Sequence, residues 1–214
     1  MASETGSESE RASPAALAAE LRAALWRPEP ELAAVRALLQ RLGPAERVAA
    51  LKRLKGRDMA RLFELCAQSP PLGVADLLPL PEAAGRTVVW EGVNSLPVFR
   101  RFQKRFYRAR PEEPELAGYN HQPLEPLTGP GCFVARAAEP AAPGAVVLDY
   151  TRTPQVQPPG WPRVRPPARG LGRLVYGGMQ DYMRRVTDDV LIGRAWRYGQ
   201  PTDNYFVLVR GGLA

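Results

Sequence analysis

The densest group of polar side chains in the sequence is the segment 118–122 (GYNHQ), which holds the single histidine of the chain. An imidazole titrates near neutral pH, so His121 is a candidate general base, oriented by Asp149 or assisted by Tyr119. A lone histidine on a predicted strand is more often structural or exposed, which is the alternative. The chain shows no nucleophile elbow, zinc-protease helix, P-loop or dinucleotide-binding motif. An enzyme is therefore the less favoured class, and no catalytic residue is assigned.

A second candidate site is the basic and aromatic segment 95–108 (SLPVFRRFQKRFYR). At helical spacing its apolar side chains share one face, which predicts an amphipathic helix over 96–108. The basic face would bind nucleic acid or an anionic membrane surface. The alternative is a helix that closes one end of a barrel, with its charges in solvent. The basic patch consists of Arg101, Lys104, Arg105 and Arg108.

A third possibility is a ligand cavity inside a β-barrel, where alternate residues of each strand face inward. On the strand at 145–151, either Val146, Leu148 and Tyr150 or the alternate set with Asp149 faces inside, and the pattern does not decide between them. In a small barrel such side chains often simply fill the core. The candidate ligand-binding residues are Trp90, Phe99, Phe102, Tyr119, Asn120, His121, Asp149, Tyr150, Tyr182 and Trp196.

The sequence predicts no metal site, no cofactor and no disulfide framework. Cys66 and Cys132 lie far apart, no CxxC pair is present, and one histidine with two distant cysteines has no known zinc-ligand spacing.

These candidates depend on a β-rich region over residues 87–214, where short runs of β-branched and aromatic residues alternate with Gly, Pro and Asp. Such a series indicates an antiparallel barrel. Residues 179–187 fit both a helical and an alternating pattern, and a strand is slightly favoured. The proline-rich stretch 152–169 predicts a long extended loop over an opening. Strands are expected near 87–93, 116–122, 131–137, 145–151, 174–178, 190–198 and 204–210.

The preceding region, residues 14–80, is expected to be helical. Leucines recur at helical spacing from Leu17 onward, and proline or glycine interrupts the pattern several times. The result is a small helical bundle, followed by a boundary near 79–86. Residues 1–13 read as a disordered tail. The predicted fold class is α+β: an N-terminal helical bundle, then an antiparallel barrel with an inserted amphipathic helix.

The formal net charge is +7. This bias fits an anionic partner, but an arginine-rich proteome produces the same bias without one. No apolar run approaches the roughly 18 to 20 residues that span a bilayer, and the Ser- and Glu-rich start does not resemble a secretory signal. A cytoplasmic location is expected.

A resemblance is carried by residues 176–199 (YGGMQDYMRRVTDDVLIGRAWRYG) and 204–210 (NYFVLVR). This stretch resembles the C-terminal pattern of uncharacterised bacterial lipocalin-like proteins, and the resemblance implies a small closed barrel. The Gly-x-Trp signature of lipocalins is absent in that form. The leading hypothesis is non-catalytic binding of a small apolar ligand inside the barrel, gated by helix 96–108 and the proline-rich loop. The alternatives are an interaction protein with a basic face and an enzyme that uses His121; oligomeric state is not predicted.

Overall fold

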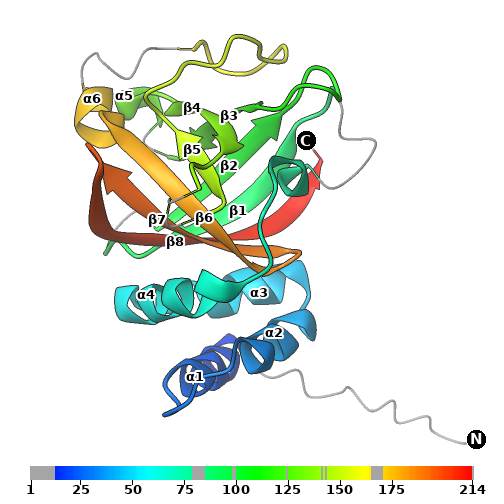
Figure 1. Ribbon diagram of the computed structural model, residues 1–214, viewed down its shortest axis with the longest axis vertical. Coiled ribbons are helices and arrows are strands. Elements are labelled where there is room, and N and C mark those ends of the chain that lie inside the picture. Colours follow the sequence, from blue (N-terminus) through cyan, green and yellow to red (C-terminus); the bar gives the residue numbers. More distant parts are fainter. Residues whose placement is uncertain are drawn as a thin grey trace, which may run out of the picture.

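The computed structural model describes residues 13–78, 85–97, 100–123, 125–140, 142, 144–164 and 171–213. Its centre is a closed barrel of eight antiparallel strands in sequence order, with β1 paired to β8 (Figure 1). The α+β class and the antiparallel barrel are thus confirmed. The strands are β1 Val88–Asn94, β2 Arg101–Tyr107, β3 Leu116–His121, β4 Cys132–Ala137, β5 Val146–Asp149, β6 Met179–Thr187, β7 Val190–Arg197 and β8 Gln200–Leu213.

Three glycines make room for aromatic rings inside the barrel. Each faces a phenylalanine directly across the ladder: Gly92 and Phe102, Gly118 and Phe133, Gly193 and Phe206. A Cβ at Gly118 would stand 2.1 Å from the ring of Phe133, and the other two pairs are as close. Because only glycine allows a ring to lie over the facing backbone, these pairs fill the interior of the barrel with phenylalanine rings.

Most of the remaining inward side chains form one apolar core. On β5, Val146, Leu148 and Tyr150 belong to this core and Asp149 does not, which decides between the two alternating sets. Trp90 is fully buried in the core, and its indole nitrogen donates to the carbonyl of Leu77, 3.0 Å away. The interior of the barrel around Trp90 and β5 is therefore packed with side chains.

Short helices cover both ends of the barrel. At one end the 3-10 helix η2, Val74–Leu77, brings Leu77 onto Trp90. At the other end α5, Glu125–Thr128, packs on α6, Leu171–Tyr176, and the ring of Tyr176 stacks on Tyr150 with centroids 5.4 Å apart. The predicted strand at 174–178 is wrong, because α6 and the turn after it occupy these residues.

Four helices precede the barrel: α1 Pro14–Leu25, α2 Leu32–Gln40, α3 Pro44–Leu51 and α4 Gly56–Leu65, followed by the 3-10 helix η1, Cys66–Gln68. Ser13 caps α1 by accepting from the backbone N–H of Ala16, as its position before Pro14 predicts. The helices α3 and α4 lie between the barrel and α1 (Figure 1). Their leucines share one apolar cluster with outward residues of the barrel wall, including Val93, Ile192 and Val207.

The predicted amphipathic helix over 96–108 is wrong, because residues 101–107 form strand β2. Phe102 and Phe106 are four residues apart, which fits one face of a helix, but they also alternate with Lys104 as in a strand. The extended form is adopted because pairing with β1 and β3 satisfies the backbone hydrogen bonds of the segment. Residues 179–187 form β6, which confirms the favoured alternative. The predicted tail and most of the predicted boundary near 79–86 lie outside the described residues.

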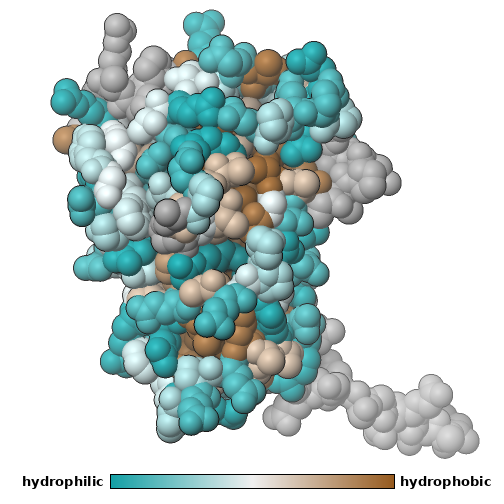
Figure 2. Space-filling model, viewed as in Figure 1, coloured by the Kyte–Doolittle hydropathy of each residue, from teal (hydrophilic) through white to brown (hydrophobic). Residues whose placement is uncertain are grey.

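The face seen in Figure 1 is mostly hydrophilic. Figure 2 shows separate hydrophobic patches on the barrel and on the helices, each bordered by hydrophilic side chains. In the part of the chain that the structure describes, no helix has the length and apolar character needed to cross a membrane.

Candidate functional site

A charged cluster lies inside the barrel, near the end covered by α5 and α6. The amine of Lys104 donates to Tyr150 Oη at 2.6 Å, to Asp181 Oδ2 at 2.9 Å and to Asn120 Oδ1 at 3.1 Å. The side chains of Lys104 and Asp181 are only 2% and 4% exposed. These groups form a complete hydrogen-bond network shielded from water.

Aromatic rings surround the Lys104 amine. The nitrogen lies 4.8 Å from the ring centroid of Phe206 and 5.2 to 5.3 Å from those of Phe102, Phe133 and Tyr150. Burial lowers the pKa of Lys104, and the charge and hydrogen bond of Asp181 oppose that shift. Burial also raises the pKa of Tyr150 well above its usual value, and the charge of Asp181 adds to the effect.

The strand register explains why these four residues meet. Lys104 on β2 faces Asn120 on β3 directly across the ladder, so both side chains point inward. Asp181 shares the inward face of β6 with Met183, two residues further along, and Tyr150 follows β5 beside β6. Asn120, Tyr150 and Phe102 were predicted from the sequence as ligand residues, Lys104 was expected on an outward basic face, and Asp181 was not predicted. An aspartate two residues from Met179 and from Met183 was the available signal, because the alternation puts it on an apolar face.

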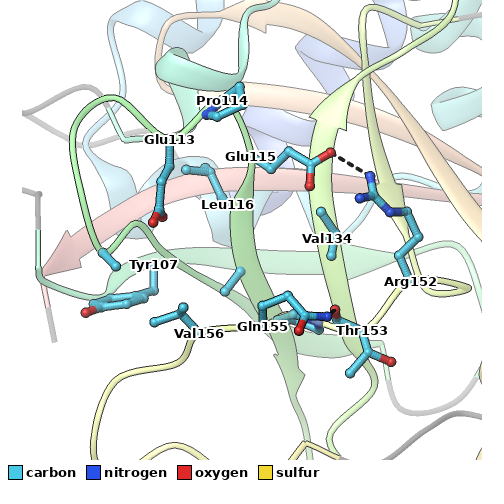
Figure 3. A pocket seen from close by; sticks show the side chains of 13 residues that line it. Tyr107, Glu113, Pro114, Glu115, Leu116, Val134, Arg152, Thr153, Gln155 and Val156 are labelled. Carbon is cyan, nitrogen blue, oxygen red and sulfur yellow. Dashed lines mark hydrogen bonds and ion pairs between the residues drawn. The ribbon is translucent and has the colours of Figure 1, made fainter.

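A groove with a volume of about 470 Å3 lies on the outer face of the barrel. Its floor is Tyr107, Ala117 and Val134 from β2, β3 and β4, Leu116 borders it, and the segment 152–156 forms one side. Figure 3 shows Val134 between the Glu115–Arg152 ion pair on one side and Tyr107 and Glu113 on the other. The groove is thus an apolar surface with charged edges.

The charges at this edge are paired with one another. Arg152 contacts Glu115 at 2.5 Å, and Arg110 contacts Glu113 at 3.2 Å. Because each carboxylate already has a guanidinium partner, the edge offers little net charge to a ligand.

The proline-rich segment is held against the barrel by Trp161. Its indole nitrogen donates to Thr87 Oγ1 at 2.9 Å, and its ring packs edge-on against Tyr119 and Tyr107, with centroids 4.7 and 6.0 Å apart. Residues 152–164 have neither helix nor strand, as predicted, and residues 165–169 lie outside the described part. The segment therefore covers the outer wall, where it forms the groove.

His121 lies at the surface, with about half of its side chain exposed, and its Nδ1 is 3.1 Å from Glu125 Oε2. Both line a second cavity, of about 480 Å3, together with Arg163 and several prolines. Among the described residues that line this cavity there is no serine, cysteine or threonine, and the partner of the imidazole is the Glu125 carboxylate. Of the partners expected from sequence, Tyr119 lies edge-on to the His121 ring, with centroids 6.4 Å apart, whereas Asp149 contacts other residues.

The remaining predicted site residues are distributed over the outer surface. Asp149 binds Arg136, Thr151 and Gln180 on the outside of the wall. Tyr182 and Trp196 pack edge-on against each other, with centroids 5.4 Å apart, and do not belong to the interior core.

The predicted basic patch is divided between the two faces of β2. Arg101 is exposed, Arg105 donates to Gln103 and Tyr119, and Arg108 donates to the carbonyl of Pro111, whereas Lys104 faces inward. Phe99 lies outside the described residues.

Comparison with protein-family models, curated proteins and solved structures finds no match for this chain. The lipocalin-like resemblance therefore stays a prediction. Among the described residues, no three His, Cys, Asp or Glu side chains gather as potential metal ligands. What defines the molecule is the fold itself: a closed eight-stranded barrel with a charged cluster inside and a groove on its outer wall.

Proposed function

We propose that the protein binds a small, uncharged, mostly apolar molecule in the groove between the proline-rich segment 152–156 and the outer face of β2, β3 and β4. The observation that carries the proposal is the groove itself, a concave space of about 470 Å3 with an apolar floor. A volume of this size is in the usual range of small-molecule sites.

The chemistry of the lining supports an uncharged ligand. Ala117 and Val134 face each other across β3 and β4 and form a flat apolar floor, and the ring of Tyr107 lies beside them. A charged ligand would have to compete with the Glu115–Arg152 pair, whereas an apolar ligand leaves that pair in place. We infer that the binding is non-catalytic, because the floor of the groove is apolar and the carboxylates at its edge are paired with arginines.

This proposal keeps the ligand class expected from the sequence and changes the location. Inside the barrel, the glycine–phenylalanine pairs and the Lys104 cluster occupy the space that a lipocalin-like ligand would need. The proline-rich segment retains its expected role beside the ligand, on the outside of the wall.

The test is a single substitution that fills the groove. Ala117 lines the floor, so Ala117→Trp places an indole where the ligand would lie. Ala137 is exposed near the end of β4 and does not line the groove, which makes Ala137→Trp the matched control. The probe is the neutral dye N-phenyl-1-naphthylamine, followed by fluorescence titration, and native mass spectrometry of the purified protein is the independent measurement.

Saturable binding is expected for the wild type and for Ala137→Trp, with at least about tenfold weaker binding for Ala117→Trp, a loss of about 1.4 kcal/mol. Equal binding by Ala117→Trp and the wild type would place the ligand elsewhere and overturn the proposal.

A further inference from the structure

Lysine is rare in this protein. Among 29 basic residues only three are lysines, Lys52, Lys55 and Lys104, and all others are arginines. Lys52 and Lys55 are exposed beside α4, whereas Lys104 is inside the barrel. A primary amine has therefore been placed in the interior of a chain that otherwise carries its positive charge almost entirely on guanidinium groups.

Barrel stability alone does not explain this amine. Taking a lysine and an aspartate out of water costs several kcal/mol per ion, and well-packed apolar residues of similar volume are often equally stable or better. The rest of the interior core is apolar. Buried titratable groups held by specific partners are typical of reactive sites.

We propose that Lys104 is a carbonyl-reactive amine, which forms an imine with a small aldehyde that reaches it from the barrel end near α5 and α6. This proposal is independent of the outer groove. It depends on three contacts of the amine: Asp181 at 2.9 Å, Tyr150 at 2.6 Å and Asn120 at 3.1 Å.

The partners match the steps of imine formation. The Lys104 ammonium first transfers one proton to the Asp181 carboxylate, which leaves a neutral amine with a free electron pair. This pair attacks the carbonyl carbon, so that the C–N bond forms and the π electrons move to oxygen. Tyr150 Oη lies within reach to protonate that oxygen and then to take back one proton from the new ammonium nitrogen, which gives a neutral carbinolamine and restores the phenol.

In the second half of the reaction, the C–O bond breaks and oxygen leaves as water, while the C=N bond forms. The neutral amine nitrogen loses two hydrogens over the whole reaction. Tyr150 and Asp181 transfer both of them to the oxygen that leaves as water. The net reaction converts one amine and one aldehyde into one imine and one water, and no oxidant or reductant is required.

The surroundings favour this chemistry in two ways. Burial lowers the pKa of Lys104, so that the unprotonated, nucleophilic form is more accessible than for a lysine in water. The rings of Phe102, Phe133 and Phe206 around the nitrogen exclude the water that hydrolyses an imine.

The side chains that cover the Lys104 cluster limit the size of the aldehyde. Phe102 is only partly buried, whereas Tyr150 and Tyr176 are fully covered and stacked. We therefore expect a small apolar aldehyde to approach past the partly exposed Phe102 ring.

Because the chain has only three lysines, N-alkylation can be assigned to each of them separately. The folded protein is incubated with propanal and sodium cyanoborohydride at pH 7, and peptide mass spectrometry follows N-alkylation over time. Lys52 and Lys55 act as exposed internal references. The α-amino group is read in its own peptide. Lys104 is expected to react at least about tenfold faster than the references, because burial lowers its pKa and leaves more of the amine unprotonated.

Two sets of variants separate reactivity from structure. In Lys52→Arg/Lys55→Arg the single remaining lysine is Lys104, and its labelling rate is expected to stay unchanged. Lys104→Arg keeps a positive charge and is expected to lose the label, which confirms its position. Tyr150→Phe removes the proposed proton donor and is expected to slow labelling of Lys104 about 100-fold. Tyr182→Phe, on the outer face, is the matched control and is expected to have no effect.

Labelling of Lys52 and Lys55 without Lys104, in protein that circular dichroism shows to be folded, would overturn the proposal. Labelling of Lys104 at the rate of the references would do the same. An equal rate for Tyr150→Phe and Tyr182→Phe would remove the role of Tyr150.

Discussion

The Lys104 ammonium and the Asp181 carboxylate lie 2.9 Å apart inside the barrel, although 77 positions separate them in the chain. Together they are a buried ion pair in a core that is otherwise almost entirely apolar. The loss of either partner leaves the other charge uncompensated, and this asymmetry can be measured.

Lys104→Met is expected to lower the free energy of unfolding by roughly 3 to 5 kcal/mol, because Asp181 then remains as an unpaired buried charge. The double variant Lys104→Met/Asp181→Leu is expected to recover most of this loss. Urea denaturation measures both. Arg41→Met, which breaks an exposed ion pair with Glu20, is the control and should change stability by less than about 1 kcal/mol. Equal losses for Lys104→Met and Arg41→Met would contradict the buried pair.

Gly118→Ala is expected to destabilise the barrel by about 1 to 3 kcal/mol, because the new Cβ would stand 2.1 Å from the Phe133 ring. Shortening the ring in Gly118→Ala/Phe133→Leu should recover part of that loss. Gly212 has no atom within 4 Å of a Cβ, so Gly212→Ala is the control and should stay within about 0.5 kcal/mol. Thermal denaturation decides, and a Gly118→Ala protein as stable as the control would show that the ring does not lie over this glycine.

Stability at acid pH should depend on Asp149. Burial acts to raise the pKa of this carboxyl, but hydrogen bonds from Thr151, Gln180 and Arg136 outweigh it and hold the pKa below its usual value. The group therefore stabilises the fold fully above the unfolded-state pKa, near 4, and this contribution is lost as the pH falls through the lower folded-state pKa.

Asp149→Asn is expected to be less stable than the wild type by about 1 to 3 kcal/mol at pH 7, and this difference should shrink towards pH 2.5. Urea titrations between these pH values measure it. Asp203 is fully exposed, so Asp203→Asn should follow the wild-type curve. A pH-independent difference for Asp149→Asn would mean that the charged form of Asp149 is not what these hydrogen bonds stabilise.

Trp161→Ala is expected to release the proline-rich segment from Thr87 and Tyr119, because one hydrogen bond and two aromatic contacts are lost. Limited proteolysis should then cut within residues 152–164 about tenfold faster, and dye binding in the groove should weaken. Trp161→Phe keeps a ring at this place and should give an intermediate rate. Unchanged cleavage in Trp161→Ala would show that other contacts hold the segment.

The order of helices and strands was accessible from local patterns. Leucine spacing predicted helices in 14–80, and alternation of β-branched and aromatic residues predicted most of the strands, because these patterns reflect which face of an element is buried. Residues 101–107 were assigned wrongly, since Phe102 and Phe106 are four apart and also alternate with Lys104 between them. Both patterns fit such a short segment, and only pairing with β1 and β3 selects the strand.

The sites depended on contacts that local patterns do not contain. Asn120, Tyr150 and Phe102 were selected from sequence, but the charge that they surround came from a residue expected at the surface, and its partner Asp181 was missed. The groove was not predicted, because its floor and its side belong to segments that meet only after Trp161 docks on the barrel.

The sequence by itself determined the α+β class, the helical first third and the series of short strands, since the 3.6- and 2-residue periods are properties of neighbouring residues. Tertiary structure decided which alternate set of each strand faces inward, where the lysine lies and which cavity is open. The physical reason is closure: once β1 pairs with β8, the strand register fixes the inward face of every strand at the same time.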